Sequence, residues 1–133
     1  MDIEFLTVAD VEAIHEEEVL RLSSTESIAI RDHGLLEPAV MAPQQTFFGD
    51  YLYPTIASMA AAYLIGIAQN HPFENGNKRA AFASCYVFLG ANGFDLDMTE
   101  DEAYEMTIGV VTHTIDRDQL TSLIENALSE ITG

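Results

Sequence analysis

Nine consecutive residues, 71–79, bring together side chains that suit phosphate chemistry: His-Pro-Phe-Glu-Asn-Gly-Asn-Lys-Arg. Gly76 permits a positive φ, which can turn successive backbone N–H groups toward one concavity. Asn77, Lys78 and Arg79 then open a helix, whose first N–H groups lack partners and carry partial positive charge. The dipole repels cations at this end, and a bound phosphate would remove that conflict. The local pattern predicts either an anion site or an ordinary glycine turn with two exposed cations.

His71 stands just before this turn, at the end of an apolar segment. Its imidazole is suited to accept a proton from an attacking hydroxyl at neutral pH. A histidine at a helix C-terminus also has a purely electrostatic explanation, because the dipole favours its positive charge. Phe73 is expected to pack the loop onto the core, and Glu74 and Asn75 offer oxygen atoms to a magnesium ion shared with phosphates.

Two apolar helices are predicted on either side of the loop, and they must position these residues. The first runs from Pro54, which suits the first turn of a helix, to about Asn70. It is apolar on nearly every side, as expected of a helix at the centre of a domain. The second runs from about Asn77 to Ala91 and stops at Asn92-Gly93, a C-terminal signal.

Further helices are predicted toward the N-terminus. Apolar residues at helical spacing begin after Thr7 and end at Ser23-Ser24-Thr25. Residues 34–41 are expected to form one or two short helical turns, bounded by Pro38 and Pro43.

Two more helices are predicted near the C-terminus from their capping residues. Thr99 and Glu102 form a capping box, and Asp116 caps the last helix. The predicted inner face of that last helix consists of Leu120, Leu123, Ile124, Ala127, Leu128 and Ile131.

Between Pro43 and Pro54 the sequence favours a short hairpin or an extended flap, because β-forming residues flank Gly49-Asp50. No long alternating strand is apparent anywhere. The chain is therefore predicted to be a single all-α domain, residues 1–133, with five or six helices and this one flap.

Composition limits the classes of partner. The chain has 133 residues, of which 22 are acidic and 5 are basic, and its formal charge is −17. Such a charge repels nucleic-acid backbones and anionic membranes. Cys85 is the sole cysteine, so an internal disulfide is impossible, and there is no basic N-terminal signal segment. A cytoplasmic protein is expected.

The acidity has two interpretations. Carboxylates spread along a chain that contains a single lysine are typical of salt-adapted proteins. An acidic bacterial protein with a basic partner is the alternative. The sequence favours neither.

The pattern His-x-Phe-x-x-Gly-Asn-Lys-Arg resembles the signature of the Fic/Doc family, in its death-on-curing (Doc) branch. Six fixed positions would arise by chance in about one chain per million. The resemblance implies that His71 is the general base that activates a target Ser or Thr hydroxyl. It also implies that Gly76, Asn77, Lys78 and Arg79 hold the phosphates of ATP, with Mg²⁺ bound nearby.

Further expectations follow from the resemblance. The flap segment, with Gln45, Thr46, Phe47 and Phe48, would position the target peptide by strand-like pairing. The family transfers AMP from ATP or, in the Doc branch, a phosphate. Doc-type proteins are toxins that inhibit bacterial growth, and a translation elongation factor is the target that the resemblance suggests. A small partner protein, the antitoxin, inhibits them.

Three positions depart from the commonest family pattern. Asn75 stands where an Asp or Glu usually ligates magnesium, so the metal site lacks one charge. AMP-transferring members carry Gly where this chain has Lys78, and a further Arg where it has Phe82. The last two differences favour the Doc branch.

Three functions follow as hypotheses. The sequence favours a Doc-type protein kinase. An AMP transferase is the nearest alternative, and a non-catalytic Fic-like binding domain is the third hypothesis. Residues 121–126 fit the loose self-inhibition pattern of some Fic proteins, but a solvated helix face explains them better. His15, His33 and His113 show no ligand spacing and are interpreted as surface or packing residues.

Overall fold

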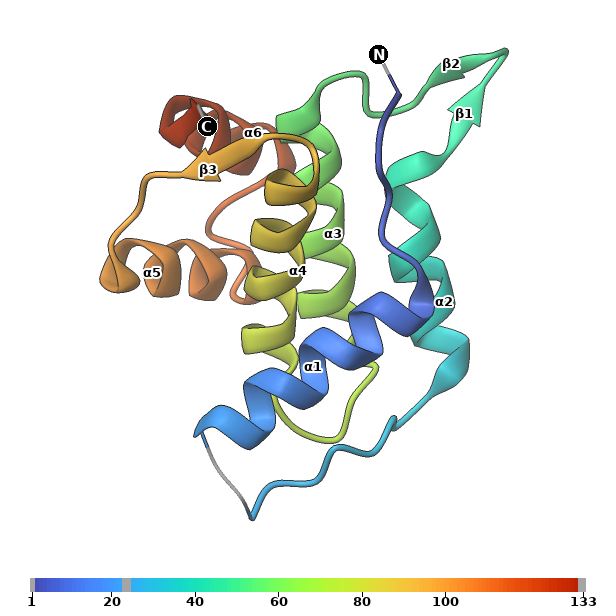
Figure 1. Cartoon of the computed structure of the whole chain (residues 1–133), viewed down its shortest axis with the longest axis vertical. Coiled ribbons are helices and arrows are strands. Elements are labelled where there is room, and N and C mark those ends of the chain that lie inside the picture. The colour runs from blue at the N-terminus through green and yellow to red at the C-terminus, as the bar shows by residue number, and fades with distance from the viewer. Residues whose placement is uncertain (1, 23–24, 132–133) are drawn as a thin grey trace.

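Helices α3 (Ile56–Asn70) and α4 (Asn77–Ala91) lie side by side and antiparallel at the centre of the protein (Figure 1). This arrangement comes from a computed structural model, which describes residues 2–22 and 25–131. The small and apolar side chains of α3 pack against α2, α4, α5 and α6, so nearly every face of α3 is buried. The predicted central helix before the loop is confirmed.

Four further helices surround this pair in the described part of the chain: α1 (Val8–Leu22), α2 (His33–Met41), α5 (Glu100–Val111) and α6 (Arg117–Ala127). A 3₁₀ turn, Ala42–Gln44, follows α2 directly. Helix α1 crosses the end of the central pair at which α3 and α4 are joined (Figure 1). The predicted all-α class, with six helices among the described residues, is confirmed.

Side-chain caps fix where several helices begin. The Thr7 hydroxyl accepts the Asp10 N–H at 3.1 Å and so starts α1. The predicted capping box at Thr99 is present, because its hydroxyl and the Glu102 carboxylate each accept the other residue's backbone N–H. Asp116 caps α6 as predicted.

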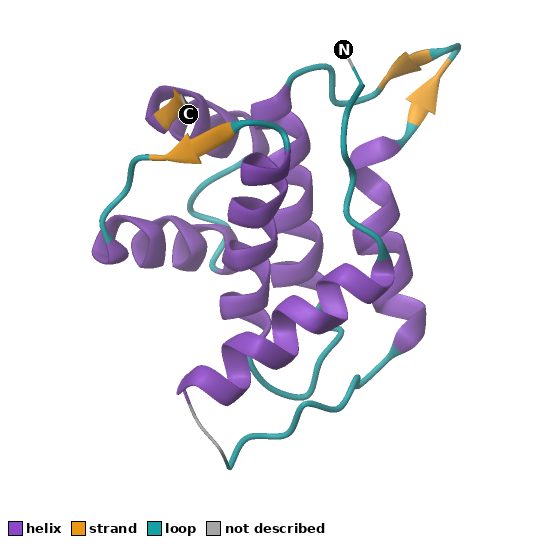
Figure 2. Ribbon diagram, viewed as in Figure 1, coloured by secondary structure: helices purple, strands orange, loops and turns teal. Residues whose placement is uncertain are grey.

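Short strands form two small sheets, drawn in orange in Figure 2. The first joins β1 (Thr46–Phe47) to β2 (Asp50–Tyr51) and is the predicted flap. The second joins β3 (Phe94–Leu96) to β4 (Leu128–Glu130) in antiparallel register, with Leu96 opposite Leu128. This second sheet was not predicted, because each of its strands has three residues and its partners lie far apart in the sequence.

Two proline positions differ from the prediction. Pro38 lies inside α2 instead of bounding it, because the Asp32 side chain accepts the Gly34 N–H and starts the helix at His33. Pro54 lies outside α3, because Thr55 caps that helix.

The last helix is shorter than the sequence predicted. Helix α6 ends at Ala127, where the chain turns into β4, so Leu128 and Ile131 are not on its inner face. Leu123, also assigned to that face, is 41% exposed. At the other end of the chain α1 extends to Leu22, and the predicted stop at Ser23-Ser24 lies outside the described residues.

One hydrophobic cluster runs through the centre and includes residues from all six helices of the described chain. Phe73 belongs to it although it lies in the loop, and it is 1% exposed. The predicted anchoring of the loop by Phe73 is therefore confirmed. A search of the described residues finds no helix with the length and hydropathy needed to cross a membrane.

Candidate active site

The loop between α3 and α4 begins and ends with residues in the left-handed region. His71 follows α3 with φ 49°, and Gly76 precedes α4 with φ 75°. The left-handed region favours glycine, and a Cβ on Gly76 would also lie 2.9 Å from Cγ2 of Val19 on α1. Gly76 is thus required both by its backbone conformation and by the close approach of α1.

A neighbouring segment holds the first half of the loop. The Pro72 carbonyl accepts the N–H groups of Arg31 and Asp32 at 2.7 and 3.1 Å, and Ala29 accepts the Glu74 N–H at 3.1 Å. The Arg31 side chain donates to the His71 and Asn70 carbonyls at 2.8 and 3.1 Å. Arg31 therefore satisfies the last carbonyls of α3 and holds the backbone of His71 in place.

The second half of the loop is closed by Asn77 and Phe73. The Asn77 amide oxygen accepts the Phe73 N–H at 3.0 Å, and its NH₂ donates to the Phe73 carbonyl at 2.9 Å. These two bonds occupy both ends of the Asn77 amide. Asn77 can therefore offer a phosphate its backbone N–H, while its side chain shapes the loop.

His15, on α1, supports the loop from beneath. Its ring stacks on Phe73 at 3.6 Å between centroids and 4° between planes, and its Nε2 lies 2.6 Å from the Asn75 carbonyl oxygen. Burial lowers the pKa of His15, the bond to Asn75 opposes this effect, and the charge of Arg79 adds to it. A neutral His15 with its proton on Nε2 donates to Asn75.

Helix α4 starts differently from its neighbours. Side chains cap α1, α2, α3, α5 and α6, but the residue at the N-cap of α4 is Gly76, which has no side chain to offer. The first bond within α4 runs from the Ala80 N–H to the Gly76 carbonyl at 2.9 Å. The N–H groups of Asn77, Lys78 and Arg79 can therefore bind another acceptor, and the helix dipole makes this end of α4 electropositive.

A groove of about 1010 Å³ lies over this helix start. His71, Glu74, Asn75 and the segment 76–79 line one end of it. Aromatic and apolar residues of α4, α5 and the β3 region line the rest of it, together with the carboxylates of Asp95, Asp97 and Glu100; among the former are Phe82, Tyr86, Met98, Tyr104 and Ile108. A pocket that combines a helix N-terminus and cations with aromatic side chains suits a ligand with a phosphate group and a ring.

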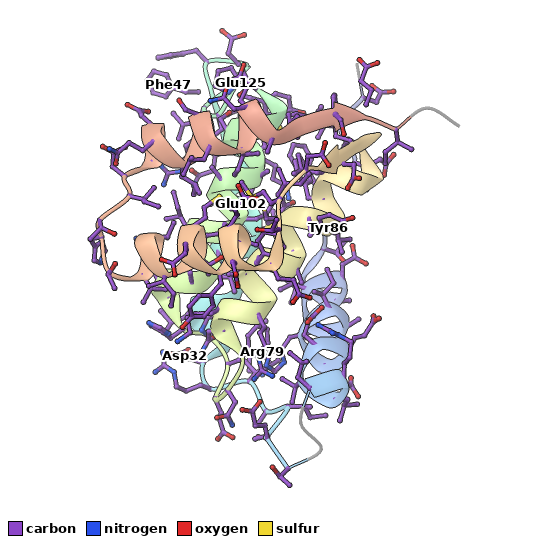
Figure 3. The ribbon with its side chains drawn as sticks, turned by 90° about the vertical axis from the view of Figure 1, so that its left-hand side faces the viewer. Asp32, Phe47, Arg79, Tyr86, Glu102 and Glu125 are labelled. Atoms are coloured by element: carbon purple, nitrogen blue, oxygen red, sulfur yellow. The ribbon has the colours of Figure 1, made fainter. Side chains whose placement is uncertain are left out.

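The basic residues of the chain gather here. Three of its five, Arg21, Lys78 and Arg79, line the groove. Arg21 is paired with Glu18 at 2.8 Å, and Arg79 is paired with Glu26 from the segment after α1. Figure 3 shows Arg79 between the loop and α1. In a chain of charge −17, this gathering gives the groove cations that an anion could bind.

The sequence of this chain is similar to those of proteins in one known family. The profile of the Fic/DOC family matches residues 5–89, which include the whole loop and α4 up to Leu89. The chain belongs to the Fic/DOC family. It is 37% identical over 116 residues to "Toxin Doc" of Mycolicibacterium smegmatis, an alignment that covers 84% of this chain and 89% of the relative. It is also 35% identical over 57 residues to "Protein kinase doc" of Escherichia phage P1, covering 43% and 44%.

The Fic/DOC signature residues of this chain are therefore brought together by the fold. His71, Glu74, Asn75, Gly76, Asn77, Lys78 and Arg79 all line the same end of the groove. Glu74 and Asn75 side chains lie beside the α4 N-terminus, where a magnesium ion would share oxygens with bound phosphates. No group of three His, Cys, Asp or Glu side chains among the described residues could hold a metal alone. A magnesium ion at Glu74 and Asn75 would therefore need further oxygen ligands from a bound nucleotide or from water.

The flap is not brought together with the Fic/DOC loop. Gln45, Thr46, Phe47 and Phe48 lie beyond the start of α3, whereas His71 follows its end (Figure 1). A helix of 15 residues separates them, which is a length of about 22 Å. The docking of a target peptide on the flap stays a prediction. A target that docks at both places must extend along α3.

The structure also shows the environment of residues 121–126 and of the three histidines outside the loop. Thr121–Asn126 lies on α6, where Glu125 is exposed and distant from Arg79 (Figure 3), so the interpretation as a solvated helix face is confirmed. His33 and His113 are exposed surface residues. His15 is a packing residue as predicted, but its bond to Asn75 ties it to the site. Its helical spacing from Val11 and Val19 on the buried face of α1 signalled its burial, not its partner.

Proposed function

We propose that this protein transfers the γ-phosphate of ATP to a Ser or Thr hydroxyl of another protein, as a Doc-type toxin. One arrangement carries the proposal. A histidine suited to act as a base stands at the same end of the groove as an uncapped helix N-terminus and two cations, Lys78 and Arg79. Membership of the Fic/DOC family and the identity to a Doc toxin support it.

The reaction needs one base and one anion hole. The target hydroxyl donates its proton to a ring nitrogen of His71, and its oxygen forms a bond to the γ-phosphorus. The bond from that phosphorus to the β,γ-bridging oxygen breaks, and ADP leaves. The N–H groups at the start of α4, together with Lys78 and Arg79, stabilise the charge on the transferred group. Magnesium, bound through Glu74 or Asn75 oxygens, would neutralise part of the charge on the phosphates.

The shape of the groove favours the γ-phosphate as the group beside His71. His71 and Lys78 line the groove near the start of α4, and the aromatic ring of Tyr86 lines it nine positions after Asn77, about 13 Å farther along the helix. A nucleoside whose base packs near Tyr86 would leave the terminal phosphate at His71. Phe82 lines the wall between them and has no donor for a leaving pyrophosphate.

The biological setting follows from the relatives. The toxin name of the mycobacterial relative supports a role as a toxin that inhibits growth. The resemblance to Doc-type proteins adds a bacterial translation factor in the cytoplasm as the proposed target. A small antitoxin would then neutralise it. The charge of −17 favours a partner or target with a basic surface.

One observation favours a second function. Asn75 offers magnesium a neutral oxygen in place of a carboxylate, which weakens the metal site. A Fic-like domain that binds nucleotide without turnover is the alternative that this residue supports. Transfer of AMP is the catalytic alternative, and Lys78 and Phe82 count against it.

Growth measurements test the toxin assignment. We expect induced expression to stop bacterial growth, and we expect His71→Asn to abolish the effect because His71 is the one histidine among the residues that line the groove. Asparagine tolerates the left-handed conformation at this position. His113→Asn is the matched control, since His113 is also exposed with φ 60°. Full toxicity of a folded His71→Asn variant would contradict the proposal.

A further inference from the structure

His15 has a geometry that packing alone does not require. It is 1% exposed and comes from α1, which is remote in sequence from the loop. We infer that His15 is a positioning residue of the anion site, which fixes the Asn75–Gly76 peptide so that the Gly76 N–H faces the phosphate. The inference rests on the proposed function, because it assumes that the segment 76–79 binds phosphate.

The orientation follows from the planarity of the peptide bond. The described chain has no cis peptide, so the Asn75 carbonyl and the Gly76 N–H point in opposite directions across one plane. The carbonyl points down to His15, with 2.6 Å between oxygen and Nε2. The Gly76 N–H therefore points away from the buried imidazole, and Gly76 itself lines the groove. It can join the N–H groups of α4 in one concavity.

The contacts around His15 leave the peptide little freedom to rotate. The ring is held by Phe73, against which it stacks at 3.6 Å, and Phe73 is itself a core residue. The position of a Cβ on Gly76 lies 3.5 Å from the His15 Nε2 and 3.4 Å from an Arg79 Nη2. His15 thus touches the backbone that binds phosphate and lies beside one of the two cations. A flipped peptide would lose the bond to His15 and turn a carbonyl toward the phosphate.

Two substitutions separate the hydrogen bond from the packing. His15→Phe keeps an aromatic ring against Phe73 and removes the donor to Asn75. His15→Gln removes the ring and supplies a side-chain N–H₂ in place of Nε2–H. If His15 positions the peptide, ATP affinity falls at least about fivefold in His15→Phe and is restored in His15→Gln, whatever their melting temperatures. If His15 only packs, ATP affinity is kept in His15→Phe and falls in His15→Gln.

The test combines ATP titrations with NMR spectra of the three proteins labelled with ¹⁵N. In the wild type we expect the backbone amide of Gly76 to shift with those of Lys78 and Arg79. In His15→Phe we expect a weaker titration and a reduced shift of Gly76. Equal affinity in His15→Phe, or a Gly76 amide unmoved while those of Lys78 and Arg79 shift, would overturn the inference and leave the phosphate site intact.

A different result would show that the proposed function itself is wrong. If ATP moves none of these amides in the wild type, the phosphate site is wrong and the inference falls with it. If His15→Phe does not fold, the wild-type shift of Gly76 and the affinity of His15→Gln still decide. A Gly76 shift with near wild-type affinity in His15→Gln supports the positioning role, and the absence of either refutes it.

Discussion

The guanidinium of Arg79 is paired with the carboxylate of Glu26, which reaches it from the segment between α1 and α2. Both residues line the groove, and both are partly exposed, at 28% and 36% of their side chains. The cation that should bind phosphate is therefore already bound to an anion of the chain itself. A nucleotide must share Arg79 with Glu26 or displace it.

This competition predicts that Glu26→Gln raises the affinity for ATP. The amide is isosteric with the carboxylate and removes the charge that holds Arg79. The gain is expected to be modest, up to about fivefold, because water screens a partly exposed pair. Isothermal titration with ATP and with inorganic pyrophosphate measures it, and both ligands should gain.

Glu18→Gln is the matched control. Glu18 lines the same groove and loses the same charge, but its partner is Arg21. A smaller gain in this variant is expected. Equal gains in the two variants would show a general electrostatic effect and would remove the specific role of Glu26.

The sequence was sufficient to predict those parts of the site that are continuous in the chain. Residues 71–79 stand between two strongly apolar segments, so their loop, the glycine turn and the helix start at Asn77 could be read directly. Glu26, Arg31 and His15 could not, because each meets the loop through a tertiary contact that leaves no local pattern. The β3–β4 pairing was missed for the same reason.

The role of the flap shows a different limit. Its hairpin was predicted from the β-forming residues around Gly49, and the pairing of Phe47 with Asp50 confirms it. Its position relative to His71 depends on the direction of α3, which no local pattern contains. Because α3 is straight and 15 residues long, elements that flank it lie at opposite ends.

Asn75→Asp is predicted to preserve or raise transferase activity. The added charge gives magnesium a carboxylate ligand, so the magnesium concentration needed for half-maximal activity should fall several-fold. The bond from His15 is unaffected, because it is made to the backbone carbonyl of Asn75. Activity measured over a magnesium titration tests this.

Asn126→Asp provides the control, because it adds the same charge on the exposed face of α6. It should leave the titration unchanged. If Asn75→Asp loses activity while its melting temperature stays the same, the neutral amide has a role of its own, and the non-catalytic binding function gains support.

The protein is predicted to become more stable as potassium chloride rises from low to molar concentration. With 22 acidic and 5 basic residues, most carboxylates have no basic partner and repel one another in the folded chain. Salt shortens the Debye length to about 3 Å at 1 M and screens this repulsion. Melting temperature against salt concentration, with sucrose at matched osmolality as the control, measures the effect. A flat or falling curve would leave the basic-partner interpretation of the acidity.

Labelled ATP identifies the group that the protein transfers. Purified protein, free of antitoxin, is incubated with bacterial lysate and ATP labelled at either the α- or the γ-phosphate, with His71→Asn in parallel. We expect a protein band to be labelled from γ-labelled ATP alone, and we expect His71→Asn to label nothing. Label from α-labelled ATP alone would contradict phosphate transfer and establish transfer of AMP. Label from neither, in several lysates, would contradict both reactions.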